Sequence, residues 1–144
     1  ILRCGQRLHL LPEPCGWRLE DQIADILRGL GVPAHVKGYH YLRRAIELAS
    51  DDAGILGAMT KELYPAVAGA FSVTPQRVER DIRRAIEIAW RRCGADARQS
   101  GFGAVSSRTG RPSNGEFIAA VADRLSIERR LRAAECRGSR LCFR

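Results

Sequence analysis

The chain has no long apolar run, few aromatic residues and almost no lysine. No segment approaches the roughly 20 apolar residues that a membrane-spanning helix needs, and the short N-terminal stretch is too broken by charge to resemble a signal peptide. We therefore expect a cytoplasmic protein with no membrane partner. Lysine occurs 2 times and arginine 22 times. A GC-rich genome would produce the same skew, so the sign of the charge means more than the residue type.

Metal-binding and catalytic patterns are missing as well. The 5 cysteines form no CxxC pair and no Cys/His spacing typical of zinc, and their odd number argues against a disulfide framework. We expect reduced thiols, no metal and no cofactor, with His35 and His40 serving in packing or hydrogen bonding. No nucleophile with a neighbouring base and no glycine-rich phosphate loop is visible, so we predict that the protein is not an enzyme.

Positive charge is what the chain does have. Its formal net charge is +8 and its sequence pI is about 9.9, which is typical of a protein with a polyanionic partner. A length of 144 residues suits one domain with a modest core.

The most informative stretch runs from Val67 to Trp90. Apolar residues in 67–71 fall on one helical face, and residues 72–74 break that pattern. Thr74 can cap a following helix through its side-chain oxygen, and Pro75 fits a first helical position, where no donor is needed. The stretch therefore predicts a helix, a tight turn with Val73 tucked beneath it, and a second helix that begins at Pro75.

This second helix is predicted to run to about Arg92 and to be strongly amphipathic. Its apolar stripe recurs at three- and four-residue steps and comprises Val78, Ile82, Ala85, Ile86, Ala89 and Trp90. The opposite face is rich in arginine. Such a pair of helices predicts a helix-turn-helix that reads double-stranded DNA.

Candidate contacts follow from the chemistry of the outward face. Arginine donates two parallel bonds to the guanine edge, and a carboxylate accepts from the cytosine amino group, so we predict base contacts by Arg77, Glu79 and Arg80. Contacts to the DNA backbone are expected from Arg83, Arg84, Thr74 and Gln76. The alternative is a solvated face on which Glu79 pairs with Arg83 and Arg80 lies near Glu87, worth a few tenths of a kcal/mol.

Other segments predict scaffold helices. Residues 19–30 form an amphipathic pattern closed by Gly31, and a second helix opens at Gly38 and buries its apolar side through Ala49. Residues 55–59 predict a short third helix. Ser113 and Glu116 form a capping box for a helix through Leu125.

The sequence resembles a known family, the C-terminal effector domain of the response regulator that initiates sporulation in endospore-forming Firmicutes, the stage zero sporulation protein A family. The resemblance covers about residues 19–128. It rests on GVPAHVKGYHYLRRAIEL at 31–48, TKELYP at 60–65, RVERDIRRAIEIAW at 77–90 and PSNGEFIAAVADRL at 112–125.

The resemblance implies an all-α, compact bundle of about six helices containing a helix-turn-helix. It further implies binding to a short asymmetric DNA box, often as a homodimer or tandem copies, with base contacts from the same second helix. Family members touch the sigma subunit of RNA polymerase after that helix, which here corresponds to Cys93, Ala97, Phe102 and Ser106. This chain departs from the family there, at Cys93, Ala97 and Ala104, although Phe102-Gly103 is kept.

The resemblance also suggests a division of the chain into three parts. Residues 1–18 correspond to a linker remnant or irregular segment, residues 19–128 to the effector domain, and residues 129–144 to a basic tail that we expect to be disordered. The first residue is Ile1 rather than Met, which indicates a fragment or a trimmed reading frame. No receiver domain is identified in this chain, so by itself we expect it to bind DNA constitutively, though weakly, without control by phosphorylation. The predicted function is sequence-specific transcription regulation; the alternative is a nonspecific DNA- or RNA-binding basic helical protein.

Overall fold

Helices make up the observed architecture. The computed structural model describes residues 18–92 and 111–142, and in these two ranges it contains five α-helices and no strand. The predicted all-α class is confirmed, whereas the expected count of about six helices is not confirmed for the described ranges. The elements are α2 (Leu19–Gly29), α3 (Lys37–Asp51), the 3₁₀ segment η1 (Ala53–Ala58), the π-helical segment η2 (Met59–Leu63), α4 (Tyr64–Phe71), α5 (Pro75–Arg92) and α7 (Asn114–Cys142).

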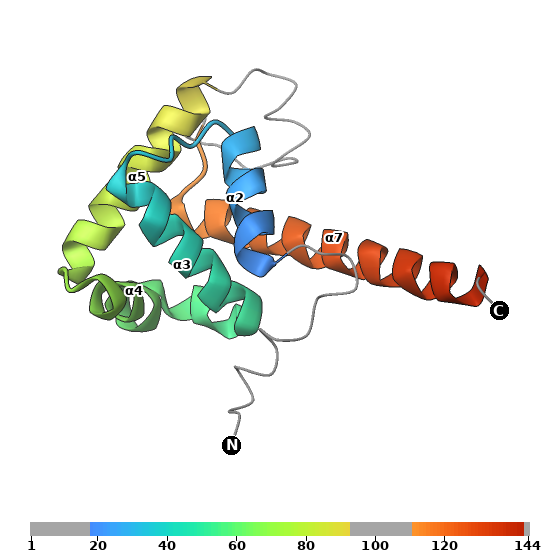
Figure 1. Cartoon of the computed structure of the whole chain (residues 1–144). Coiled ribbons are helices and arrows are strands. Elements are labelled where there is room, and N and C mark those ends of the chain that lie inside the picture. The colour runs from blue at the N-terminus through green and yellow to red at the C-terminus, as the bar shows by residue number, and fades with distance from the viewer. Residues whose placement is uncertain (1–17, 93–110, 143–144) are drawn as a thin grey trace.

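Helix α3 is the centre of the fold. It packs against α2, α4, α5 and α7, and α5 lies along one edge of the molecule while α7 runs away from it on the other side (Figure 1). The predicted buried side of α3 is confirmed. It comprises Tyr41, Leu42, Ala45, Ile46 and Ala49, together with Tyr39.

Helix α2 ends as its sequence predicts. Gly31 has a φ of +85°, a left-handed conformation that glycine adopts without steric cost. Its N–H donates to the carbonyl of Arg28, and the N–H of Val32 donates to the carbonyl of Leu27, both at 3.0 Å. This turn satisfies the last carbonyls of α2 and directs the chain toward α3.

The first turn of α3 lies directly against α5 because Gly38 has no side chain. A Cβ atom built on Gly38 would lie 2.2 Å from the carbonyl oxygen of Asp81 and 2.8 Å from the Cβ of Ala85. No real side chain tolerates such distances. Gly38 therefore permits a backbone approach between α3 and α5 that any other residue would prevent.

Helix α7 begins at the predicted capping box. The N–H of Ser113 donates to Glu116 Oε2 at 2.9 Å, and the N–H of Glu116 donates to Ser113 Oγ at 3.2 Å. Its buried side consists of Phe117, Ile118, Val121 and Leu125.

Helix α7 does not end where the resemblance to the family ends, at about residue 128. It continues to Cys142, whereas the sequence predicts a disordered tail from Arg129 onward. Arginine, leucine, alanine and glutamate are all good helix formers, and no proline interrupts them, so the net charge of the segment was a poor guide to its conformation. None of the helices in the described ranges combines the length and apolar character that a membrane crossing requires.

Replacing Gly38 with alanine should destabilise the fold. The new methyl group would meet the backbone of α5, which cannot move as a flexible side chain can, so we expect the free energy of unfolding to fall by about 1–3 kcal/mol. Gly69→Ala in α4 is the matched control. Nothing lies within 4 Å of a Cβ at that position, so this change should stabilise the protein by roughly 0.5–1 kcal/mol. Urea unfolding of both variants measures the difference; equal stability for Gly38→Ala and the wild type would contradict the close approach.

Candidate nucleic-acid interface

The segment between α4 and α5 is a tight turn. Ser72 closes α4 in the left-handed region at φ 54°, and the N–H of Val73 donates to the carbonyl of Ala68 at 3.0 Å. Val73 is half-buried and packs against the core. Phe71 falls on the same helical face as Val67 and Ala68 in the sequence pattern, yet it is 41% exposed. Its ring meets the ring of Tyr41 edge-on, with 5.1 Å between the two ring centroids.

Helix α5 starts where its sequence predicts. Thr74 Oγ1 accepts a hydrogen bond from the N–H of Arg77 at 3.3 Å, and Pro75 is the first helical residue. The predicted range Pro75 to about Arg92 is confirmed.

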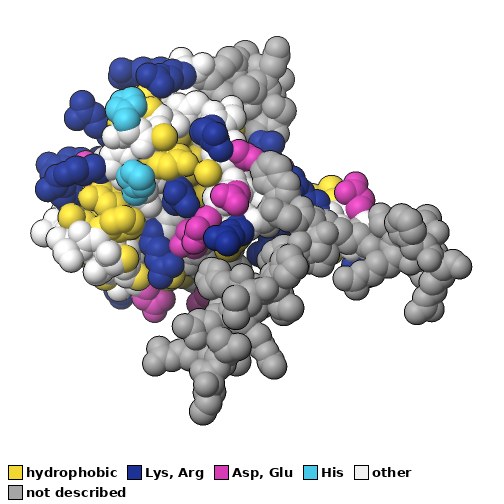
Figure 2. Space-filling model, in the orientation of Figure 1, with side chains coloured by type: hydrophobic (Ala, Val, Ile, Leu, Met, Phe, Trp, Pro, Cys, Tyr) yellow, Lys and Arg dark blue, Asp and Glu magenta, His cyan; other side chains and the backbone are white. Residues whose placement is uncertain are grey.

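The apolar stripe of α5 is buried against the domain. Its fully buried residues are Val78, Ile82, Ala85, Ile86 and Ala89, and Trp90 is half-buried. Burying a valine or isoleucine side chain contributes about 1.5–3 kcal/mol, so this edge fixes the rotation of α5 about its own axis. The arginines of the opposite face, namely Arg77, Arg80, Arg83 and Arg84, are exposed. Lysine and arginine side chains gather along the edge of the molecule that α5 occupies (Figure 2).

Some of these arginines are paired within the helix. Arg83 bonds Glu79, and Arg77 Nε lies 3.6 Å from Asp81 Oδ2. Exposed pairs of this kind contribute only about 0.3–0.5 kcal/mol, so another partner can replace them at little cost.

The pairing does not extend to every arginine of α5. In the part of the chain that the structure describes, Arg80 and Arg84 make no ion pair or hydrogen bond through their side chains. Glu87, which the alternative interpretation placed near Arg80, bonds Arg111 instead. The solvated-pair interpretation therefore holds for Glu79 with Arg83 and does not hold for Arg80 with Glu87.

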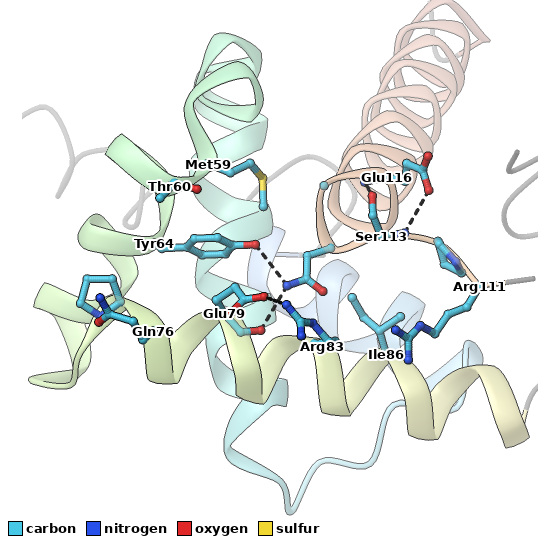
Figure 3. A pocket seen from close by; sticks show the side chains of 14 residues that line it. Met59, Thr60, Tyr64, Gln76, Glu79, Arg83, Ile86, Arg111, Ser113 and Glu116 are labelled. Atoms are coloured by element: carbon cyan, nitrogen blue, oxygen red, sulfur yellow. Dashed lines mark hydrogen bonds and ion pairs between the residues drawn. The ribbon is translucent and has the colours of Figure 1, made fainter. Parts of the chain in front are cut away.

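Two grooves flank α5. The larger, of about 1010 Å³, lies between α5 and the start of α7, and Gln76, Glu79 and Arg83 line it (Figure 3). The smaller, of about 430 Å³, lies between α5 and the start of α3, and Arg77 and Arg84 line it. The three predicted base-contacting residues are thus not gathered on one flank: Glu79 belongs to the larger groove and Arg77 to the smaller. At 100° per residue along a helix, Arg80 falls between them.

The amide of Asn114 ties three helices together at the larger groove. Its Nδ2 donates to the hydroxyl of Tyr64 in α4 and to the backbone carbonyl of Glu79 in α5, both at 3.1 Å. Sequence reasoning did not find Asn114 or the bond between Arg111 and Glu87. These partners lie 24 to 50 residues apart, so no local spacing signals them.

Several predicted residues cannot be placed. Cys93, Ala97, Phe102 and Ser106, the candidate contacts to RNA polymerase, lie outside the described residues. Within residues 18–92 and 111–142, no group of three His, Cys, Asp or Glu side chains is arranged to hold a metal ion.

Comparison with known families agrees with this arrangement. A family model described as "Sporulation initiation factor Spo0A C terminal" matches residues 23–125. The chain belongs to this family. It is a DNA-binding effector domain of the sporulation-initiation response-regulator type, and the resemblance seen in the sequence is confirmed. The match ends at Leu125, the last fully buried residue among the α7 side chains that the structure describes, so the rest of that helix lies outside the family match.

Removing the Asn114 amide should destabilise the domain. Asn114→Ala deletes two partly buried hydrogen bonds, so we expect the free energy of unfolding to fall by about 1–3 kcal/mol. Tyr64→Phe removes only one of the two bonds and should cost about half as much. Chemical denaturation of both variants and of the double variant measures the effect. If Tyr64→Phe cost as much in the Asn114→Ala background as in the wild type, the two side chains would not be coupled.

Proposed function

We propose that this domain is a sequence-specific DNA-binding transcription regulator in which α4 and α5 act as a helix-turn-helix. The supporting observation is the rotation of α5, which buries one edge and leaves its arginine face open within the described part of the molecule. An 18-residue helix is about 27 Å long, and with its side chains it is about 10–12 Å wide. Its first two turns therefore fit a major groove about 12 Å wide.

The proposed base contacts are made by Arg77, Glu79 and Arg80. Arg80 needs no rearrangement, because it has no competing partner among the described residues. Arg77 and Glu79 exchange weak intrahelical pairs for base edges. Backbone contacts come from the flanks and the start of the helix, through Arg83, Arg84, Thr74 and Gln76.

Two further interactions are proposed only because the family implies them. A contact with the sigma subunit of RNA polymerase and binding as tandem copies or a homodimer both remain predictions. The alternative function, nonspecific binding to DNA or RNA, needs the same positive charge and differs in the absence of sequence preference.

Arg80→Ala and Arg84→Ala should affect DNA binding differently. Loss of a guanine contact costs about 1–3 kcal/mol and relaxes base preference, so Arg80→Ala should weaken binding to the family's DNA box far more than binding to a scrambled duplex. Arg84→Ala should weaken both duplexes equally and reduce the salt dependence. Fluorescence anisotropy with both duplexes over a range of salt concentrations measures this.

The same titrations of the wild-type protein distinguish sequence-specific binding from nonspecific binding. Tighter binding to the box than to the scrambled duplex supports the proposal. Equal affinity for both, with a steep salt dependence, would establish the nonspecific alternative. If the wild type prefers the box and Arg80→Ala shows the same preference, the assignment of Arg80 to a base contact is wrong.

A further inference from the structure

We propose that the smaller groove beside α5 holds the phosphate backbone of one DNA strand, with Lys37 and His35 as contacts in addition to Arg84. This inference rests on the proposed function, because it assumes that α5 enters the major groove. It adds a second element of the fold, the start of α3, to the DNA-binding surface.

Basic side chains from two parts of the fold converge on this groove. Lys37 is the first residue of α3 and His35 lies in the turn before it, whereas Arg77 and Arg84 belong to α5. Lys37, His35 and Arg84 are exposed, and none of them forms an ion pair or side-chain hydrogen bond with the described residues. Asp81 is the one carboxylate among the lining residues, and Arg77 is already beside it at 3.6 Å. The groove therefore carries uncompensated positive charge.

The larger groove on the opposite flank differs in charge. Its arginines are Arg83, which bonds Glu79, and Arg111, which bonds Glu87. Glu116 also lines it and is bonded to the backbone of Ser113. A polyanion gains more from the smaller groove, where Lys37 and Arg84 have no partner among the described residues, than from the larger groove, where both arginines are paired.

The geometry places the smaller groove where a DNA strand would pass. A helix with its side chains nearly fills the width of the major groove, so whatever lies beside the helix faces the phosphates at the groove edge. The start of α3 lies immediately beside α5, because Gly38 allows the two backbones to meet. The remaining lining residues, Val36, Gly38, Ala85 and Ile88, offer no negative charge.

Lys37→Gln tests the inference. Each neutralised phosphate contributes about 0.9 to the slope of log affinity against log salt concentration. Loss of one phosphate contact therefore lowers the affinity about fivefold at about 0.15 M salt. We therefore expect Lys37→Gln to bind the family's box and a scrambled duplex about fivefold more weakly than the wild type at that salt concentration. The salt slope should fall by about 0.9, and the preference for the box should not change. Lys37→Arg, which keeps the charge, should retain the wild-type slope.

The matched control is Arg130→Gln on α7. Arg130 is exposed, and its helix runs away from α5 (Figure 1), so this change removes one positive charge far from the proposed site. It should leave affinity and salt slope close to those of the wild type. Equal losses in Lys37→Gln and Arg130→Gln would show that net charge alone matters and would overturn the inference.

Failure of the inference can be told from failure of the proposed function. If the wild type prefers the box and Lys37→Gln matches it in affinity and slope, the phosphate contact is wrong while the function stands. If the wild type shows no preference, the proposed function fails. The changed slope of Lys37→Gln then still decides whether the groove binds phosphate.

Discussion

The burial of one edge of α5 against α3 is the constraint on which the rest of the structure depends. Val78, Ile82 and Ala85 face the interior, and Gly38 lets the start of α3 touch the backbone of α5. With that edge buried, the helix cannot rotate, so its arginine face must point away from the body. The same contact brings Lys37 beside α5. One packing interaction thus positions both the proposed base-contacting face and the proposed phosphate-binding groove.

The two flanks of α5 serve different purposes in this account. On the α7 side, Asn114 and the bond between Arg111 and Glu87 hold α5 against the domain, and the second of these lowers the free charge of that flank. On the α3 side, Arg77 lies beside Asp81, whereas Lys37 and Arg84 have no partner among the described residues and remain available to phosphate. Both flanks hold α5, but the attachments on the α3 side are apolar and backbone contacts, so they hold the helix without neutralising Lys37 and Arg84.

Local chemistry made much of the fold predictable from sequence. Thr74 and Pro75 marked the start of α5, Ser113 and Glu116 the start of α7, and Gly31 the end of α2, because each feature acts within a few residues. The partners of Asn114 and Arg111 lie far away in sequence and left no local pattern. The two grooves exist only once α3, α5 and α7 are packed, so no local pattern indicates them, although helical spacing alone already separates Arg77 from Glu79. The continuation of α7 past Arg129 was not foreseen, because the charge of that segment says nothing of its helix propensity.

The central claim is that the exposed face of α5 enters the major groove, and methylation interference tests it most directly. Methylation at N7 of guanine alters the major-groove edge, whereas methylation at N3 of adenine alters the minor groove. With the family's box as the duplex, the account predicts that N7 methylation of guanines within the box blocks binding by the wild-type domain and that N3 methylation does not. Interference confined to adenine N3 would contradict the account.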